Sequence, residues 1–232
     1  MPDYPEHLRG FDYRGPFRYF LTICTHQRAL YFIDERNVAL VSAPFQRASR
    51  EQAFAVITYC FMPNHVHLVV KPRGSGSLSR FMQWLLGTYA QRYRDQRRTC
   101  GHLWQGRFRS CPVQSDRQMI LVLRYVERNP VRACLVDRAE GWPWSSARDR
   151  VSRFADRGLL SPSPVELPEP WLDIVNEPLT SAELARIRES VGRGRPLGES
   201  DWARDTALRM GLESTFRRRG RPPGKRGLTP LE

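Results

Sequence analysis

The 232-residue sequence lacks several features that define common protein classes. Its five cysteines lie far apart and form no CxxC pair, which excludes a disulfide framework and a zinc ribbon and predicts single buried thiols in a reducing compartment. No glycine-rich loop of the NTPase type is present, so nucleotide hydrolysis is not expected. No stretch approaches the ~20 apolar residues of a membrane span, and the N-terminal segment has no apolar signal core. We therefore expect a soluble, cytoplasmic protein with no membrane partner.

Lysine is also scarce, because Lys71 and Lys225 are the only two lysines among 37 basic residues. A GC-rich genome can explain why arginine replaces lysine, but it does not explain a net charge of +13. The isoelectric point of about 10.3 lies above the value of about 9 that is typical of nucleic-acid-binding domains. Arginine offers a bidentate fork to phosphate and can stack on bases. The charge therefore predicts a polyanionic partner, with a merely solvated basic surface as the alternative.

Seven segments of the chain carry the patterns of strands and helices. Strands are expected where aromatic, β-branched and apolar residues cluster, at 17–25, 54–62, 65–71 and within 104–113. Helices are expected at 34–52, 77–98 and 115–129. Only Pro63 and Asn64 separate the second and third strands, so these two form a β-hairpin. The order matches a split βαβ arrangement, an α+β fold with an antiparallel sheet covered by helices on one face.

The composition changes near residue 151. Residues 1–150 hold the expected sheet and most of the excess positive charge. Residues 151–232 begin with a Pro-rich linker, include a short amphipathic helix at 181–191 and end in a basic tail. Residues 214–228 of that tail carry six basic residues and no acidic one. We therefore expect one domain at 1–150, followed by a C-terminal extension at 151–232.

Two histidines alternate along the third expected strand. Because successive side chains of a strand point to opposite faces, His65 and His67 share one face while Val66 lies on the other. Two adjacent imidazoles on a sheet can chelate one divalent ion. The alternative is a pair of partly exposed strand histidines with no ligand.

Tyr125 and Asn129 lie four residues apart on an expected helix, so both project from one of its faces. Tyr125 stands between an apolar run and a charged helix end, where a phenol can be half-buried with its hydroxyl exposed. On spacing alone, a core aromatic is the favoured interpretation of Tyr125, and a cap for the turn that starts at Pro130 is the favoured interpretation of Asn129.

Aromatic, amide and guanidinium groups alternate in the segment from Trp104 through Gln105 and Arg107 to Arg109. Gly106 within it allows a close backbone approach. This composition suits a groove for single-stranded nucleic acid, in which bases stack on rings and arginines follow the phosphates. An edge strand with solvated arginines is the alternative.

Four motifs in a fixed order resemble those of a known family: MPNHVHLVV at 62–70, GHLWQGRF at 101–108, RYVERNPVRA at 124–133 and WPWSS at 142–146. They are similar to those of the REP-associated tyrosine transposases, a domesticated branch of the single-tyrosine HUH transposases. The resemblance covers about residues 10–150, and GRPLGE at 194–199 is similar to the C-terminal region of the same branch.

The resemblance implies a ferredoxin-like fold and metal-dependent cleavage and rejoining of single-stranded DNA. In it, His65, His67 and Asn129 match ligands of Mg²⁺ or Mn²⁺, and Tyr125 matches the nucleophile that forms a 5′-phosphotyrosine. The partner it implies is single-stranded DNA beside imperfect hairpins of repetitive extragenic palindromes. The candidate DNA-binding residues are Trp104, Gln105, Arg107, Arg109, Arg124, Arg128 and Arg132.

The sequence is also consistent with other functions. A non-catalytic DNA-binding protein could retain the same scaffold, and an RNA-binding protein or a metal phosphohydrolase is a third class. The resemblance favours a monomer in the bacterial cytoplasm, associated with the nucleoid, and leaves a dimer possible. The basic tail could add phosphate contacts, or the extension could fold over the active face and inhibit it.

Overall fold

A four-stranded antiparallel sheet forms the centre of the computed structural model, which describes residues 17–51, 54–73, 78–114, 117–151 and 159–217. Its strands, in the spatial order β2-β3-β1-β4, are β1 (Arg18–Cys24), β2 (Phe54–Met62), β3 (His65–Pro72) and β4 (Arg109–Val113). Helix α1 (Glu35–Arg50) follows β1, and helix α2 (Leu78–Arg97) follows β3. This connectivity and strand order are those of the ferredoxin-like split βαβ fold, so the expected α+β class is confirmed.

The β2–β3 hairpin turns through Pro63 and Asn64, as the sequence predicts. Met62 pairs with His65 and Cys60 pairs with His67, and the register shifts once between Val56 and Thr58. Because β3 also pairs with β1, it lies inside the sheet with neighbours on both sides. The histidine-bearing strand is therefore held rigidly along its whole length.

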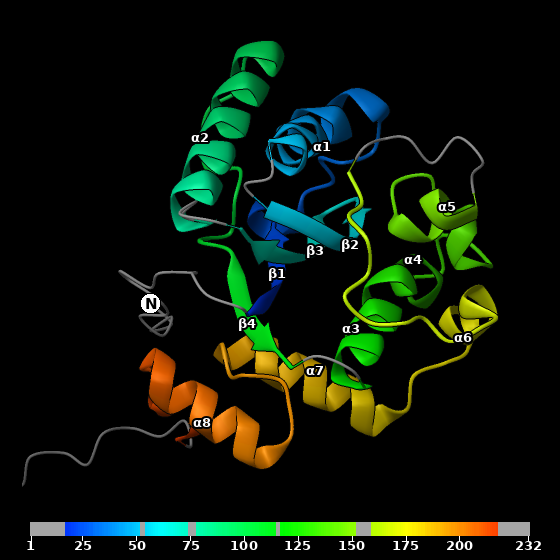
Figure 1. Ribbon diagram of the computed structural model, residues 1–232. Coiled ribbons are helices and arrows are strands. Elements are labelled where there is room, and N and C mark those ends of the chain that lie inside the picture. Colours follow the sequence, from blue (N-terminus) through cyan, green and yellow to red (C-terminus); the bar gives the residue numbers. More distant parts are fainter. Residues whose placement is uncertain (1–16, 52–53, 74–77, 115–116, 152–158, 218–232) are drawn as a thin grey trace, which may run out of the picture.

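Helices α1 and α2 cover one face of the sheet (Figure 1). This first face is apolar, with Tyr19 and Leu21 of β1 and Leu68 of β3 buried against Phe45 of α1. The N-terminus of α1 is capped by Asp34, whose carboxylate accepts from the Asn37 backbone N–H. The first face thus matches the layer that the sequence predicts.

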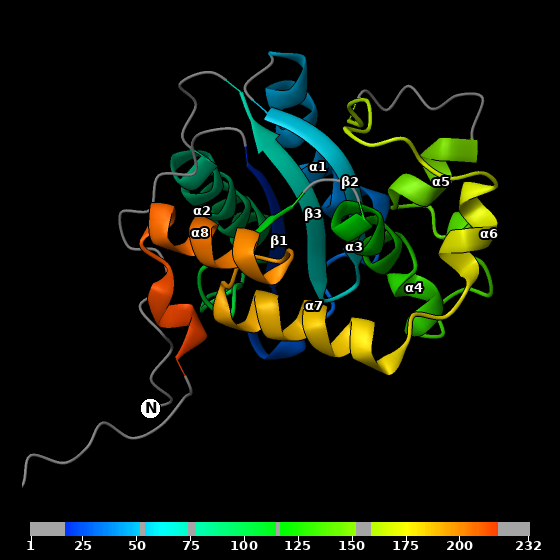
Figure 2. The same ribbon diagram turned by 60° about the horizontal axis from the view of Figure 1, so that its bottom comes forward.

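The opposite face of the sheet is also covered, which the prediction of helices on one face omits. Helix α3 (Arg117–Glu127) and helix α7 (Ser181–Arg193) lie on this second face (Figures 1 and 2). Their Val122 and Ile187 are fully buried with Phe20 of β1 and Cys60 of β2. Since the strands are apolar on both sides, both sides must be removed from water.

The other helices come from the last part of the described chain: α4 (Asn129–Arg132), α5 (Ser146–Val151), α6 (Trp171–Asn176) and α8 (Ser200–Met210). The expected helix at 181–191 is α7, and α6 begins directly after the Pro-rich segment that ends at Pro170. A boundary at residue 150 stays a prediction, although residues 159–217 share the second buried cluster with the sheet. The basic tail beyond Arg217 and the start of the expected helix at 115 lie outside the described residues.

All five cysteines are free thiols. Cys60 and Cys111 are buried as expected, whereas Cys100 and Cys134 are exposed because they lie in connections between elements. Within the described ranges, no helix combines the length and apolarity that crossing a membrane takes.

Candidate active site

The two histidines of β3 lie on the second face of the sheet. The ring centroids of His65 and His67 are 4.7 Å apart, with the rings nearly perpendicular. His67 is buried, and His65 keeps part of its surface exposed. The shared face follows from strand alternation, because the intervening Val66 packs into the first-face core.

Each imidazole is oriented by a neighbouring polar side chain. The Thr22 hydroxyl of β1 lies 3.0 Å from His67 Nδ1, and the Asn64 Oδ1 of the hairpin turn lies 2.7 Å from His65 Nδ1. Asn64 Oδ1 can only accept, so His65 Nδ1 carries the proton in this contact. Its Nε2 then keeps a lone pair for a ligand, the arrangement that metal-binding histidines use.

Tyr125 faces these imidazoles from helix α3. Its ring centroid lies 5.5 Å from that of His67 and 5.8 Å from that of Phe20. The side chain is buried except for 8% of its surface. The phenol therefore belongs to the same cluster as the histidine pair, brought there from 58 residues farther along the chain than His67.

Asn129 stands at the first position of α4, just after α3 ends at Glu127. The expected single helix is therefore interrupted between Tyr125 and Asn129, although backbone hydrogen bonds continue across the junction from Arg128 and Arg132. Asn129 is almost fully buried, and its Oδ1 accepts a hydrogen bond of 2.6 Å from Arg132 Nη2. Its Nδ2 finds no partner within the described residues.

Two arginines make this cluster electropositive. Arg132 lies with its guanidinium carbon 5.6 Å from the Tyr125 ring centroid. Burial, together with the charges of Arg28 and Arg132, lowers the pKa of His65 to about 4. Burial is also the main cause that holds the pKa of His67 well below its usual value, and His65 and the same arginines add to it. Both imidazoles are therefore neutral near pH 7.

Arg28 was not among the residues that the sequence singled out. It lies in the connection after β1, where Gln27 and Arg28 both have positive φ, at 50° and 59°. Non-glycine residues seldom adopt this conformation, and such strain is often found at functional sites. A single arginine in a connecting segment gives no sequence signal for this placement.

The donor set offers an electrically neutral site for a cation. No group of three or more His, Cys, Asp or Glu side chains that could hold a metal occurs in the described part of the chain. The candidate ligands are instead two neutral imidazoles and one amide oxygen, from His65, His67 and Asn129. Imidazole nitrogen and amide oxygen are both donors to divalent cations, so these three side chains could hold one such ion.

The candidate DNA-binding residues divide into two groups by location. Gln105, Arg107 and Arg109 are exposed before and at the start of β4, where a strand of nucleic acid can reach them. Trp104 instead packs against the first-face core, with its ring centroid 5.1 Å from that of Tyr89. Its indole N–H donates to the Leu86 carbonyl over 2.9 Å.

Arg124 and Arg128 contact the C-terminal part of the chain. Arg124 Nε donates to the Ile174 carbonyl over 3.0 Å, and Arg128 Nε donates to the Asn176 carbonyl over 3.1 Å. Both acceptors belong to α6, within the expected C-terminal extension at 151–232. These two guanidinium groups thus have protein partners, unlike the exposed Arg107 and Arg109, for which no ion pair or hydrogen bond is recorded in the described structure.

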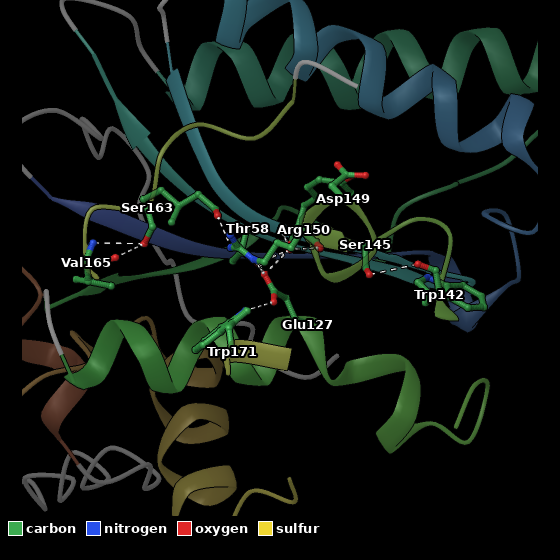
Figure 3. A network of polar contacts seen from close by, with 12 residues as sticks. Thr58, Glu127, Trp142, Ser145, Asp149, Arg150, Ser163, Val165 and Trp171 are labelled. Carbon is green, nitrogen blue, oxygen red and sulfur yellow. Dashed lines mark hydrogen bonds and ion pairs between the residues drawn. The ribbon is translucent and has the colours of Figure 1, made fainter. Parts of the chain in front are cut away.

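A buried polar network surrounds Glu127, two residues after Tyr125 in the sequence (Figure 3). Glu127 is fully buried, and Thr58, Arg150 and Trp171 converge on its carboxylate in Figure 3. Oε1 accepts from Arg150 Nε over 2.9 Å and from Ser146 Oγ over 2.7 Å, and Oε2 accepts from Trp171 Nε1 over 2.8 Å. In the sequence, Glu127 stands at a charged helix end, a position that by itself predicts no role.

Comparison with known proteins agrees with this geometry. The model of the IS200-like transposase family matches residues 16–129, a span that runs from β1 through Tyr125 to Asn129. This chain carries an IS200-like transposase domain. The domain includes all four strands of the sheet, both imidazoles and the phenol.

Two relatives resemble the transposase domain and its flanking regions. A Haemophilus influenzae protein, provisionally named a REP-associated tyrosine transposase, is 24% identical over 150 residues, which cover 58% of this chain and 84% of the relative. A solved REP-associated tyrosine transposase bound to a REP hairpin superposes with a TM-score of 0.53 at 16% identity, covering 76% of this chain and 99% of that one. The structural likeness confirms the fold, including part of the region beyond residue 150.

Proposed function

We propose that this transposase domain cleaves and rejoins single-stranded DNA beside small hairpins, through a covalent bond between the DNA and Tyr125. The observation that carries the proposal is the cluster on the second sheet face, where the Tyr125 ring lies 5.5 Å from His67 and beside a pair of imidazoles. A phenol, two neutral imidazoles and a buried amide are unusual companions in an apolar layer. They are the groups that a phosphodiester exchange needs.

The proposed step exchanges one phosphoester for another. The Tyr125 phenolic oxygen forms a bond to the scissile phosphorus, and the bond from phosphorus to the 3′ oxygen of the leaving strand breaks. The phenolic proton is lost, the departing oxygen gains a proton, and the products are a 5′-phosphotyrosine and a free 3′-hydroxyl. Rejoining runs the same exchange in reverse with a 3′-hydroxyl as nucleophile, so the cycle needs no ATP.

A phenol with an ordinary pKa of about 10 is a weak nucleophile at neutral pH, so the phosphate must be polarised. His65, His67 and Asn129 would hold Mg²⁺ or Mn²⁺. When bound, the ion would supply Lewis-acid polarisation of the phosphate oxygens and orient the scissile group. The neutral donor set supports this assignment, because a phosphodiester then provides the negative charge that the protein ligands lack.

The positive residues around the cluster would bind the DNA strand. The charges of Arg28 and Arg132 lower the pKa of His65. Both side chains are exposed, so they can contact a phosphate. Arg107 and Arg109 extend the basic surface beyond the cluster. The REP hairpin bound by the structural relative supports a hairpin as the partner of this domain as well.

The decisive experiment uses hairpin DNA labelled at either the 5′ or the 3′ side, incubated with Mn²⁺ or with a chelator. Wild-type protein is expected to form a covalent adduct only when the metal is present, and only with the fragment on the 3′ side of the cut, which carries the 5′ phosphate. Tyr125→Phe is expected to form no adduct while its affinity for the hairpin changes by less than about twofold, since one hydroxyl is lost. Tyr93→Phe on α2, at the other face of the sheet, is the matched control and should behave as wild type.

Two outcomes would contradict the proposal. An adduct that persists in Tyr125→Phe would assign the nucleophile elsewhere. Salt-sensitive hairpin binding by wild-type protein, with no cleavage in Mn²⁺, would favour a non-catalytic DNA-binding protein. Gel filtration with and without the hairpin tests the further prediction of a monomer.

A further inference from the structure

We propose that residues Trp171–Glu177, here called the α6 clamp, form a positioning device that fixes the C-terminal end of α3 and thereby Tyr125. The inference deepens the proposed function and rests on Tyr125 as the nucleophile. It assigns a role to a short segment of the C-terminal extension that had no assigned function, and it gives Arg124, Arg128 and Glu127 a common role.

The first contacts of the clamp come from two arginines of α3 and its C-terminal junction. Arg124 donates through Nε to the Ile174 carbonyl and through Nη2 to the Glu177 carbonyl, the latter over 3.3 Å. Arg128 donates through Nε to the Asn176 carbonyl. Carbonyls in the last turn of a helix lack partners within the helix, and cations are favourable there. The three bonds therefore join α3 to the end of α6 where that helix most readily accepts them.

The second contact is the buried bond between Glu127 and Trp171. The Trp171 indole is only 5% exposed, and its N–H donates to Glu127 Oε2 over 2.8 Å. The other carboxylate oxygen accepts from Arg150 and Ser146 of α5. Glu127 is thus held between α5 and α6. Because a buried charge must stay paired, each of these bonds restrains the helix that carries it.

The clamp holds the side of α3 that does not face the histidines. Arg124, Glu127 and Arg128 are spaced three and four residues apart, so they share one side of the helical path. Tyr125 is rotated away from that side and contacts His67 and Phe20. The α6 clamp can therefore set the position of the phenol without covering the imidazole pair.

Holding several arginines together here has a cost that the clamp offsets. Burial, together with the charges of Arg124 and Arg132, lowers the pKa of Arg128. The carbonyls of α6 accept from Arg124 and Arg128, which compensates for part of the repulsion between neighbouring guanidinium groups. This explains why charged residues beside the candidate nucleophile point toward protein backbone.

Two other roles make different predictions for the same residues. If Arg128 mainly binds DNA, its loss weakens hairpin affinity and reduces the salt dependence by about one phosphate contact. If the clamp contributes only to the stability of the fold, a variant elsewhere that is destabilised to the same extent should lose the same amount of cleavage activity. A positioning role instead lowers the cleavage rate at saturating DNA and leaves affinity unchanged.

The experiment compares full-length Trp171→Phe, Arg128→Ala and Arg128→Lys with two controls. Trp171→Phe keeps an aromatic ring but loses the bond to Glu127, and Arg128→Lys keeps a charge that can still reach a carbonyl. Arg107→Ala serves as the DNA-contact control. Phe45→Leu on the first face serves as the stability control, with its melting temperature compared with those of the clamp variants.

We expect cleavage at saturating hairpin to fall by about 10- to 100-fold in Trp171→Phe and Arg128→Ala, because small displacements of a reacting group have effects of this size. Hairpin affinity should stay within about twofold of wild type, and Arg128→Lys should recover part of the rate. Arg107→Ala should show the opposite pattern, with weaker binding and a nearly normal rate at saturation. An affinity loss in Arg128→Ala with a normal saturated rate, or an equal rate loss in Phe45→Leu, would overturn the proposal.

Hydrogen exchange separates this inference from the proposed function. Amides of 121–129 should exchange faster in Trp171→Phe and Arg128→Ala than in wild type, whether or not the protein cleaves DNA. If wild-type protein forms no adduct but exchange increases as expected, the proposed function fails while the clamp stands. If exchange at 121–129 is unchanged in both clamp variants, α6 does not restrain α3 and the inference is wrong.

Discussion

The two faces of the central sheet are built from alternate residues of the same strands, yet they are filled very differently. On the first face, Leu21 and Leu68 meet the aromatic and aliphatic side chains of α1 and α2. On the second face, the neighbouring positions Thr22 and His67 are polar, and helix α3 carries a fully buried carboxylate, Glu127. One face can therefore serve stability alone, while the other combines packing with groups capable of chemistry.

Helices α1 and α2 of the split βαβ unit both lie on the first face. The second face is covered by helices from later in the chain. Ile187 of α7, Leu197 and Trp171 complete its buried cluster. The buried Glu127 carboxylate is matched by four hydrogen bonds, from Thr58, Ser146, Arg150 and Trp171. Since an unpaired buried polar group is costly, the C-terminal elements make a polar second face tolerable.

The largest effect that tests this contrast is expected from Phe45→Ala. Phe45 is fully buried on the first face and packs edge-on against Phe81. Its truncation should lower the free energy of unfolding by about 3–5 kcal/mol, measured by urea denaturation. Adduct formation per folded molecule should stay at the wild-type level at temperatures where the variant is folded. A loss of adduct formation by the folded variant would show that packing on the first face also affects the site on the second face.

A smaller effect is expected from Thr22→Val on the second face. The variant keeps the shape of the side chain but removes the hydroxyl that lies 3.0 Å from His67 Nδ1. Mn²⁺ affinity, followed by electron paramagnetic resonance, should fall by about 10-fold because the imidazole loses its orienting partner. Thr88→Val on α2, on the other side of the sheet, should leave Mn²⁺ binding unchanged. Equal affinities in wild type and Thr22→Val would remove Thr22 from the site.

The smallest effect is expected from Thr180→Ala, which tests whether every part of the second helical layer affects cleavage. Thr180 and Glu183 form a reciprocal capping box at the start of α7, away from the histidine pair. Losing the cap should reduce the free energy of unfolding by about 1 kcal/mol in thermal or urea unfolding. Adduct formation should be unaffected. A marked fall in cleavage would mean that α7 also takes part in holding the cluster.

Much of the fold follows from sequence periodicity. The strand expected at 54–62 is β2 to the residue, and the helix expected at 77–98 is α2 with one residue less at each end. These segments are long and strongly patterned, so local sequence and tertiary packing agree. The helices of the second layer, α3 and α7, were expected as elements, but their placement was missed because local periodicity does not reveal which face of the sheet a helix covers.

The site was only partly accessible from sequence. Alternation placed His65 and His67 on one face, and the resemblance selected Tyr125 and Asn129 beside them. Sequence could not show that Arg124 and Arg128 bind α6, because their acceptors are backbone carbonyls about 50 residues away. It also could not show that Trp104 is a packing residue, since aromatic and arginine neighbours look the same in a DNA groove and at a core boundary.

Both outer strands of the sheet are paired with later parts of the chain. Val56 of β2 forms a parallel bridge with Leu160, and Val113 of β4 forms one with Leu197. The Leu197 backbone N–H donates to the Pro112 carbonyl, and the Gln114 N–H donates back to Leu197. The unpaired backbone groups of an exposed edge strand can pair with a strand of another molecule, and these bridges occupy some of those groups. At these positions, a second copy of this protein could extend the sheet only by displacing the chain's own segments.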